Sequence, residues 1–178
     1  MDQLFAETDK HLNQDVSIVL IGGTALVIKY LSPRSTLDVD TYNRIPKILL
    51  GAWKKAEENI KIHIPLAQST VAEGPYLMED RFTIYKDLDL KYLKIFIPEA
   101  ADIIMMKLIR LLSKDRDDIS HLIKSEKISD ALLLKRFTEE MTHIIGNFKI
   151  IKSHYLFIIE ENYGNKIADK HQKKIKHL

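Results

Sequence analysis

The sequence predicts an α/β (α+β) fold, with a small, mixed, twisted sheet, flanking helices and a helical C-terminal part. Strand-like segments rich in β-branched or alternating residues stand at Val16–Ile21, Leu37–Tyr42 and 90–97. After Pro98, apolar residues recur at the spacing of amphipathic helices. No low-complexity linker separates the two parts, so we expect them to pack as one unit.

The first half of the chain alternates helices and strands. A short helix is expected at 2–12, followed by the buried strand Val16–Ile21 and a helix over 24–31 that the segment "SPRS" breaks. Leu37–Tyr42 has the period-2 pattern of a strand and should lie beside Val16–Ile21. The helix over 46–60 carries its proline in the first turn, where proline is tolerated.

The region 65–88 is less regular, because Pro65 and Gly74-Pro75 indicate a loop with one or two short strands, one of them at 81–85. The strand over 90–97 ends at Pro98. Helical patterns then cover 98–113 with the charged continuation 114–123, 127–145 and 149–164. We therefore expect a core over 1–124 and, packed on it, a helical extension with a basic tail over 125–178.

Composition excludes several kinds of chemistry. The chain of 178 residues has no cysteine, which excludes disulfides, thiolate catalysis and cysteine-ligated zinc. Its seven histidines show no HExxH spacing, and no GxSxG segment is present. The N-terminus does not resemble a secretory signal, and the apolar runs are far below the roughly 18 residues of a membrane span. We expect a cytoplasmic protein with no membrane partner; the sequence gives no indication of its oligomeric state.

The net charge of +2 is small, but positive charge gathers in the last thirteen residues. These residues contain Lys166, Lys170, Lys173, Lys174 and Lys176, against Asp169. Such a tail is either a solvated, frayed end or a weak contact to RNA or another polyanion.

Two glycines follow the first strand directly. Gly22 and Gly23 would let a phosphate approach the backbone N–H groups at the start of the next helix, where the helix dipole favours negative charge. Thr24 would add a hydroxyl donor or cap the helix. The alternative is a tight strand-to-helix turn that requires a positive φ.

Two aspartates lie one residue apart on the second predicted strand. The spacing places Asp38 and Asp40 on one face, with Val39 pointing into the core. Two carboxylates this close repel each other unless a cation lies between them, and hard oxygen ligands suit Mg²⁺. The alternative is an exposed strand face with two solvated acids. Arg34 would neutralise a phosphate or serve as an ordinary loop arginine.

Residues 22–40, "GGTALVIKYLSPRSTLDVD", resemble the signature of the nucleotidyltransferase superfamily, which has the DNA polymerase β-like fold. The resemblance implies a sheet of that type. It also implies that Gly22 and Gly23 hold the triphosphate of an NTP, and that Asp38 and Asp40 bind Mg²⁺ or Mn²⁺.

Residues 90–122 resemble the AbiEii-toxin-like branch of uncharacterised bacterial nucleotidyltransferases, with which the likeness runs from about residue 16 to 124. The positions that match its lysine and Asp-x-x-Asp motif are Lys107, Lys114, Asp115, Asp118 and Ile119. Independently, Lys107 and Asp118 are eleven residues apart and would share a face of one continuous helix. Lys107 then either pairs with triphosphate oxygens or forms a structural salt bridge between the helical part and the core.

One feature departs from the superfamily, in which many members carry a third carboxylate on a later strand. The segment 90–97 contains no acid, and Asp87, Asp89 and Asp102 only flank it. The candidate site residues are therefore Asp38, Asp40, Lys107 and Asp118 for catalysis, Asp38 and Asp40 for the metal, and Gly22, Gly23, Thr24, Arg34 and Lys107 for the nucleotide.

The leading functional hypothesis is Mg²⁺-dependent transfer of a nucleoside monophosphate from an NTP to a hydroxyl acceptor. The acceptor would be RNA, especially a tRNA end, or a protein side chain, and the AbiEii-like motif suggests a toxin–antitoxin relation. The alternative, favoured by the missing third acid, is a non-catalytic nucleotide-binding or partner-binding module. A third hypothesis is simple RNA binding through the basic tail.

Overall fold

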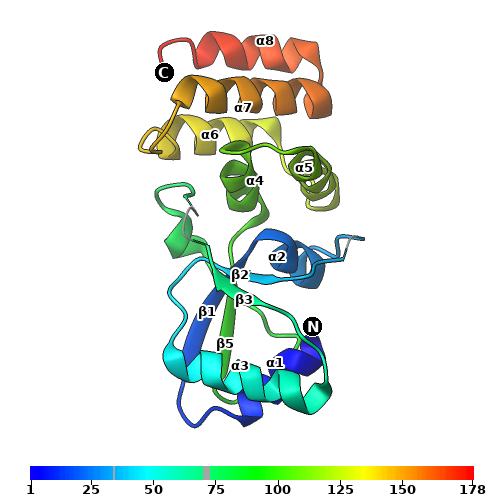
Figure 1. Cartoon of the computed structure of the whole chain (residues 1–178). Coiled ribbons are helices and arrows are strands. Elements are labelled where there is room, and N and C mark those ends of the chain that lie inside the picture. The colour runs from blue at the N-terminus through cyan, green and yellow to red at the C-terminus, as the bar shows by residue number, and fades with distance from the viewer. Residues whose placement is uncertain (34, 70–72) are drawn as a thin grey trace. The chain divides into compact units, whose positions relative to one another are not determined.

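The structure, a computed structural model, describes residues 1–33, 35–69 and 73–178. Within these ranges it contains a mixed five-stranded sheet and eight α-helices, which confirms the predicted α/β class (Figure 1). The chain divides into two compact units. The first comprises Met1–Ala72 and Phe82–Pro98, and the second comprises Glu73–Arg81 and Glu99–Leu178.

The whole sheet belongs to the first unit. Its strands are β1 (Val16–Ile21), β2 (Val39–Thr41), β3 (Leu66–Gln68), β4 (Thr83–Ile84) and β5 (Leu93–Ile97). Their order is β3-β2-β1-β5-β4, with β1 antiparallel to β2 and parallel to β5. The prediction that Val16–Ile21 and Leu37–Tyr42 are neighbours is confirmed, although β2 is shorter than the alternating segment. The central strand β1 is almost wholly apolar because most of its side chains are buried.

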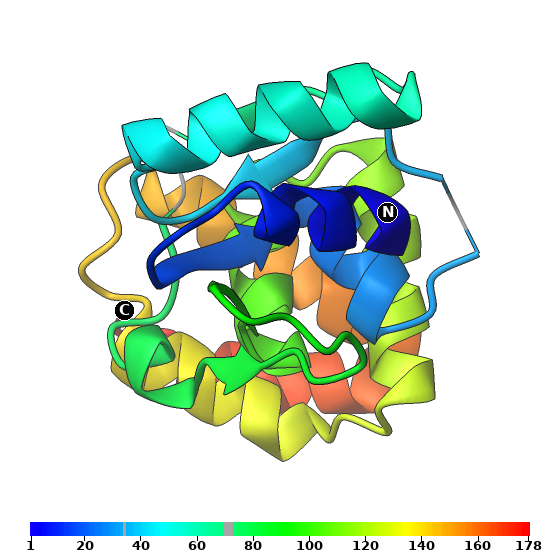
Figure 2. The ribbon, with the colours of Figure 1, turned by 90° about the horizontal axis from the view of Figure 1, so that it is seen from below.

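Three helices accompany the sheet: α1 (Asp2–Lys10), α2 (Gly22–Lys29) and α3 (Lys47–Ile60). Helices α1 and α3 pack side by side (Figures 1 and 2), and the rings of Phe5 and Trp53 meet edge to face at 5.8 Å. The buried carboxylate of Asp9 accepts N–H hydrogen bonds from residues 91–93, which ties α1 to the start of β5. Trp53 is thus a packing residue.

The second unit is helical. Its elements are the 3₁₀ turn Met78–Arg81 and the helices α4 (Ala100–Leu108), α5 (Ser113–Ser125), α6 (Asp130–Glu140), α7 (Phe148–Tyr163) and α8 (Asn165–Lys174). Helix α7 contacts α4 and α5 as well as α8, so it lies inside the stack of helices (Figure 1). No helix in the described part of the chain is long and apolar enough to cross a membrane.

One helical prediction is wrong. The sequence pattern favoured a continuous helix carrying both Lys107 and Asp118, but the chain turns between α4 and α5. Leu111 adopts a φ of 44° in this turn, which is a left-handed conformation. Because the residue is not a glycine, the sequence does not indicate this conformation. Lys107 therefore lies on α4 and Asp118 on α5.

The basic tail is a packed helix rather than a frayed end. Helix α8 lies along α7 and buries Ala168, His171 and Ile175. The His171 ring joins Tyr155 of α7 to Asp130 of α6, with Tyr155 Oη 2.8 Å from Nδ1 and Asp130 Oδ2 3.0 Å from Nε2. The lysines of α8 thus lie on the surface of a packed helix.

Candidate functional site

The turn from β1 into α2 requires glycine for two reasons. Gly22, the first residue of α2, has a φ of 61°, in the left-handed region. A Cβ atom built on Gly22 would lie 3.0 Å from Oδ2 of Asp40, closer than side chains normally approach. The positive-φ turn, which was the alternative to phosphate binding, is present at Gly22, and the group nearest to it is a carboxylate of the Asp-x-Asp pair.

The antiparallel pairing of β1 with β2 brings this carboxylate to the turn. Ile21 is the register partner of Asp40, so Asp40 faces the last residue of β1. Val39 is fully buried, whereas Asp40 is half-buried and Asp38 is exposed. Asp40 lies on β2, on the opposite side of the strand from the Val39 side chain, and Asp38 lies in the bend directly before β2.

Hydrogen bonds hold the segment before β2 against α2. The hydroxyl of Thr24, itself buried, donates to the backbone oxygen of Asp38 over 2.7 Å. Thr24 is not the N-cap of α2, because the helix starts two residues earlier. The Thr36 hydroxyl lies 3.2 Å from Oδ1 of Asp38 and restrains the carboxylate itself. Thr24 therefore positions Asp38.

The side chain of Asn43 extends the β1–β2 pairing past the end of β2. Its Oδ1 accepts the N–H of Val19 over 2.7 Å, and its Nδ2 donates to the Ser17 oxygen over 3.0 Å. Neither Thr36 nor Asn43 was predicted as a site residue from the sequence. The signal for both is their place, a few residues before and directly after the Asp-x-Asp strand, where short polar side chains bond the backbone.

Asp38 and Asp40 are the residues whose chemistry would suit a divalent cation beside the glycine turn. Asp38 and Asp40 supply hard oxygen donors, and the missing side chain at Gly22 leaves room beside Asp40 Oδ2. Among the described residues no group of three or more His, Cys, Asp or Glu side chains could hold a metal ion. Further ligands would thus be water and phosphate oxygens. Arg34 falls outside the described residues.

No acid stands on β5, the parallel neighbour of β1. Strand β5 pairs with β1 in parallel and reads LKIFI, without a carboxylate. Asp87 and Asp89 are exposed residues in the bends before β5. Asp102 is fully buried in the second unit, where the Arg81 guanidinium binds it over 2.8 and 2.9 Å. The sequence-based expectation that none of the three acids occupies a strand position is in line with this arrangement.

The structure brings Lys107 and Asp118 together within the second unit, and adds Asp115. The Lys107 ammonium donates to Asp115 Oδ1 over 2.9 Å and to Asp118 Oδ2 over 2.7 Å. The Lys107 side chain is 9% exposed and both carboxylates are buried. Because two carboxylates already neutralise Lys107, this geometry favours a structural ion pair over a triphosphate clamp. The pair joins two helices of one unit, and not the helical part to the core.

Asp115 is the centre of this cluster. Burial raises the pKa of its carboxyl, but the hydrogen bond and charge of Lys107, together with Arg110 and the Leu112 N–H, outweigh that effect and hold the pKa below its ordinary value. Asp115 is thus ionised when it links α4 to the start of α5. Sequence analysis identified it as a motif position but not as a site residue.

A second ionic network surrounds Asp102 in the helical unit. Arg81 also binds Glu140 over 2.7 Å, and Arg136 reaches Glu140 over 2.7 Å and Asp102 over 3.4 Å. Burial raises the pKa of Asp102, and the nearby Arg81 offsets only part of the effect. The members of this ionic network come from positions 81 to 140, so no local sequence pattern predicts the network. The network joins the 3₁₀ turn to α4 and α6.

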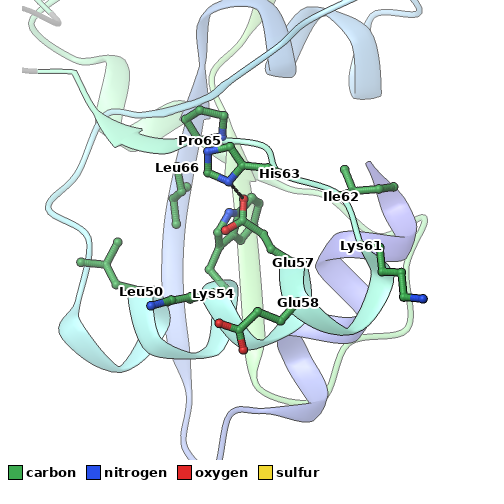
Figure 3. Close-up of a pocket in the computed structure, with 10 residues that line it drawn as sticks. Leu50, Lys54, Glu57, Glu58, Lys61, Ile62, His63, Pro65 and Leu66 are labelled. Carbon is green, nitrogen blue, oxygen red and sulfur yellow. Dashed lines mark ion pairs between the residues drawn. The ribbon is translucent and has the colours of Figure 1, made fainter.

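A separate groove of about 610 Å³ lies in the first unit between the end of α3 and the start of β3 (Figure 3). Its lining includes none of the predicted site residues. Glu57 at its centre accepts the N–H of Ile64 over 2.7 Å and lies 3.0 Å from Nδ1 of His63. Trp53 donates its indole N–H to the Ile64 oxygen over 2.9 Å. These contacts fasten the α3–β3 connection, which gives the groove residues a structural role.

A mixed sheet whose central strand ends in a glycine turn, next to a strand that carries Asp40 and is preceded by Asp38, is typical of a nucleotidyltransferase-type protein. The comparison with known families agrees: residues 1–166 match the family described as "nucleotidyltransferase of unknown function (DUF6036)". The chain belongs to this family, and the predicted nucleotidyltransferase resemblance is confirmed at that level. No curated protein and no solved structure gives a significant match.

Proposed function

We propose that the protein transfers a nucleoside monophosphate from an NTP to a hydroxyl acceptor, with release of pyrophosphate. The observation that carries the proposal is the contact between Gly22 and Asp40. A positive-φ glycine at a helix start lies directly against a carboxylate of the Asp-x-Asp pair. Membership in a nucleotidyltransferase family supports the reaction class.

In this proposal, each part of the first unit has one task. The N–H groups of Gly22 and Gly23 bind triphosphate oxygens at the positive end of α2. Asp38 and Asp40 hold Mg²⁺ or Mn²⁺, which offsets the charge that develops on the phosphates in the transition state. Thr24 and Thr36 position Asp38, through its backbone oxygen and its carboxylate respectively.

The test is substitution of Asp40 by asparagine. This variant keeps the side-chain shape but loses the charge, so Mg²⁺-dependent NTP consumption should fall to background while the melting temperature stays within a few degrees. Asp87→Asn removes an exposed acid outside the strands and serves as the matched control with normal turnover. Unchanged turnover in Asp40→Asn would remove the two-carboxylate mechanism.

The acceptor we propose is RNA, including a tRNA end, with a protein side-chain hydroxyl as the competing choice. Incubation with each labelled NTP and total cellular RNA, followed by separation of RNA from protein, identifies the labelled class. If the protein is the toxin of a toxin–antitoxin pair, its expression should arrest growth, and Asp40→Asn should restore it.

The second candidate function is a non-catalytic nucleotide-binding module. It is favoured by the acid-free sequence of β5, the parallel neighbour of β1. Calorimetry with each NTP and Mg²⁺ distinguishes the two. Binding without pyrophosphate release in the presence of RNA favours the module, whereas turnover favours the enzyme.

A further inference from the structure

Two adjoining cavities lie between α7 and the C-terminal helix α8. Their volumes are about 450 and 580 Å³, and Lys152, Leu156 and Lys176 line both of them. We call the two together the α7/α8 groove. The two helices run antiparallel, joined at Gly164, so that the start of α7 lies beside the end of α8 (Figure 1).

The groove is strongly basic because one face of each helix contributes lysines at helical spacing. The charged side chains in its lining are Lys149, Lys152, Asp169, Lys173 and Lys176. Phe148 and Leu156 add apolar surface between the charges. The sequence showed only the lysines of the tail, since those of α7 join them through the fold.

In the described part of the chain, the lysines of the groove lack the carboxylate partners that neutralise the buried cations elsewhere in this unit. Lys107 and Arg136 each contact two or more carboxylates. Within the described residues, by contrast, none of the four groove lysines forms an ion pair with a carboxylate. Lys152 is in addition half-buried. An anionic ligand would supply the missing counter-charges.

We propose that the α7/α8 groove binds the phosphodiester backbone of single-stranded RNA. Several lysines placed along an elongated groove suit a ligand that repeats its negative charge, and lysine binds phosphate as a point charge. The apolar surface of Phe148 and Leu156 gives bases or riboses a place to pack. The inference rests on the proposed function, because it names the acceptor that supplies the hydroxyl group.

Binding is measured by fluorescence anisotropy with a labelled single-stranded RNA of about 12 nucleotides, a length within the usual site sizes. NTP and divalent metal are left out, so a failure of catalysis does not affect the result. The groove variant is Lys152→Ala/Lys173→Ala/Lys176→Ala. The matched control, Lys166→Ala/Lys170→Ala/Lys174→Ala, removes the same charge from residues that line neither cavity. Melting temperatures confirm that both variants fold.

The expected result follows from counterion release. Each lost phosphate contact lowers the slope of log K against log salt by about 0.7 for single strands, so the groove variant should lose about 2 from the slope and bind about 100-fold more weakly at 0.1 M salt. The control should stay within about threefold of the wild type.

Three results would overturn the proposal: equal weakening in both variants, no RNA binding by the wild type at 50 mM salt, or groove-dependent binding to phosphatidylserine vesicles without RNA binding. The first would indicate diffuse attraction to the basic surface, and the last would assign the groove to a lipid surface. If Asp40→Asn still binds RNA and the wild type shows no turnover, the proposed function is refuted but the assignment of the groove to RNA is not.

Discussion

Replacing Gly22 by alanine tests the geometry at the centre of the candidate site. An L-residue at the φ of 61° costs about 1–2 kcal/mol relative to glycine. The new Cβ would also lie 3.0 Å from Asp40 Oδ2, so the carboxylate must move by a few tenths of an ångström. For a chain of this size, each kcal/mol lowers the melting temperature by roughly 2–4 °C. We expect a decrease of about 2–8 °C.

Gly51→Ala is the matched control, because it makes the same chemical change in a different setting. Gly51 is an exposed residue inside α3, and an added Cβ would meet nothing within 4 Å. Alanine is favoured over glycine in a helix interior by about 0.5–1 kcal/mol. In urea and thermal unfolding the two substitutions should thus change the stability in opposite directions, with Gly22→Ala less stable and Gly51→Ala more stable than the wild type.

A double-mutant cycle separates the two sources of the Gly22 penalty. In an Asp40→Ala background the contact with Oδ2 is absent, so Gly22→Ala should cost less there, while the cost of the positive φ remains. Affinity for an NTP with Mg²⁺ should fall in Gly22→Ala at a temperature where it is folded. The reasoning is refuted if Gly22→Ala unfolds at the wild-type temperature and binds the nucleotide normally.

Three further predictions concern the helical unit. Lys107→Met leaves two buried carboxylates without their cation and should lower the free energy of unfolding in urea by about 3–5 kcal/mol. The control Arg110→Ala changes a side chain that is 61% exposed and should lower it by less than about 1 kcal/mol. A Lys107→Met variant that is stable but has lost NTP binding would restore the clamp hypothesis. The lowered pKa of Asp115 means that its ion pair stabilises the fold above the unfolded pKa of about 3.9 and is lost as pH falls through the folded value. The difference in unfolding free energy between wild type and Asp115→Asn should therefore narrow below about pH 4, and a constant difference would contradict the assignment. Burial lowers the pKa of His171 despite the nearby Asp130, so the folded protein loses stability as pH falls through the unfolded value of about 6.5. His171→Asn should show a smaller drop in melting temperature from pH 7.5 to 5.5, while the exposed His177→Asn should keep the wild-type drop.

Local patterns were sufficient to predict the part of the fold that carries the candidate site. The apolar run Val16–Ile21 and the alternation around Val39 each indicate a strand by themselves. The glycines between β1 and α2 mark a turn that other residues would strain. Because every one of these signals lies within some twenty-five residues, the pairing of β1 with β2 also followed from the sequence.

Features that depend on distant residues could not be predicted in this way. The short strand β3 has no clear period, and only its pairing with β2 defines it, whereas β4 lies inside the strand predicted at 81–85. The turn between α4 and α5 contains a leucine at positive φ, which residue types do not reveal. The lysines that α7 adds to the basic groove become neighbours of the tail only when α8 folds back along α7.

The surroundings of Lys107 limit which charges can act on a triphosphate. A lysine held by two buried carboxylates belongs to a cluster without excess positive charge, even when Arg110 is included. A triphosphate would therefore gain little from this cluster unless an ion pair first broke, which costs several kcal/mol for buried groups. In the proposed reaction the compensating charge would come mainly from the start of α2, from a cation on Asp38 and Asp40, and from the predicted clamp Arg34. For this reason we assign the two sequence motifs different roles. The glycine and Asp-x-Asp segment is the proposed site of nucleotide and metal binding, whereas the Lys107 motif stabilises the helical unit.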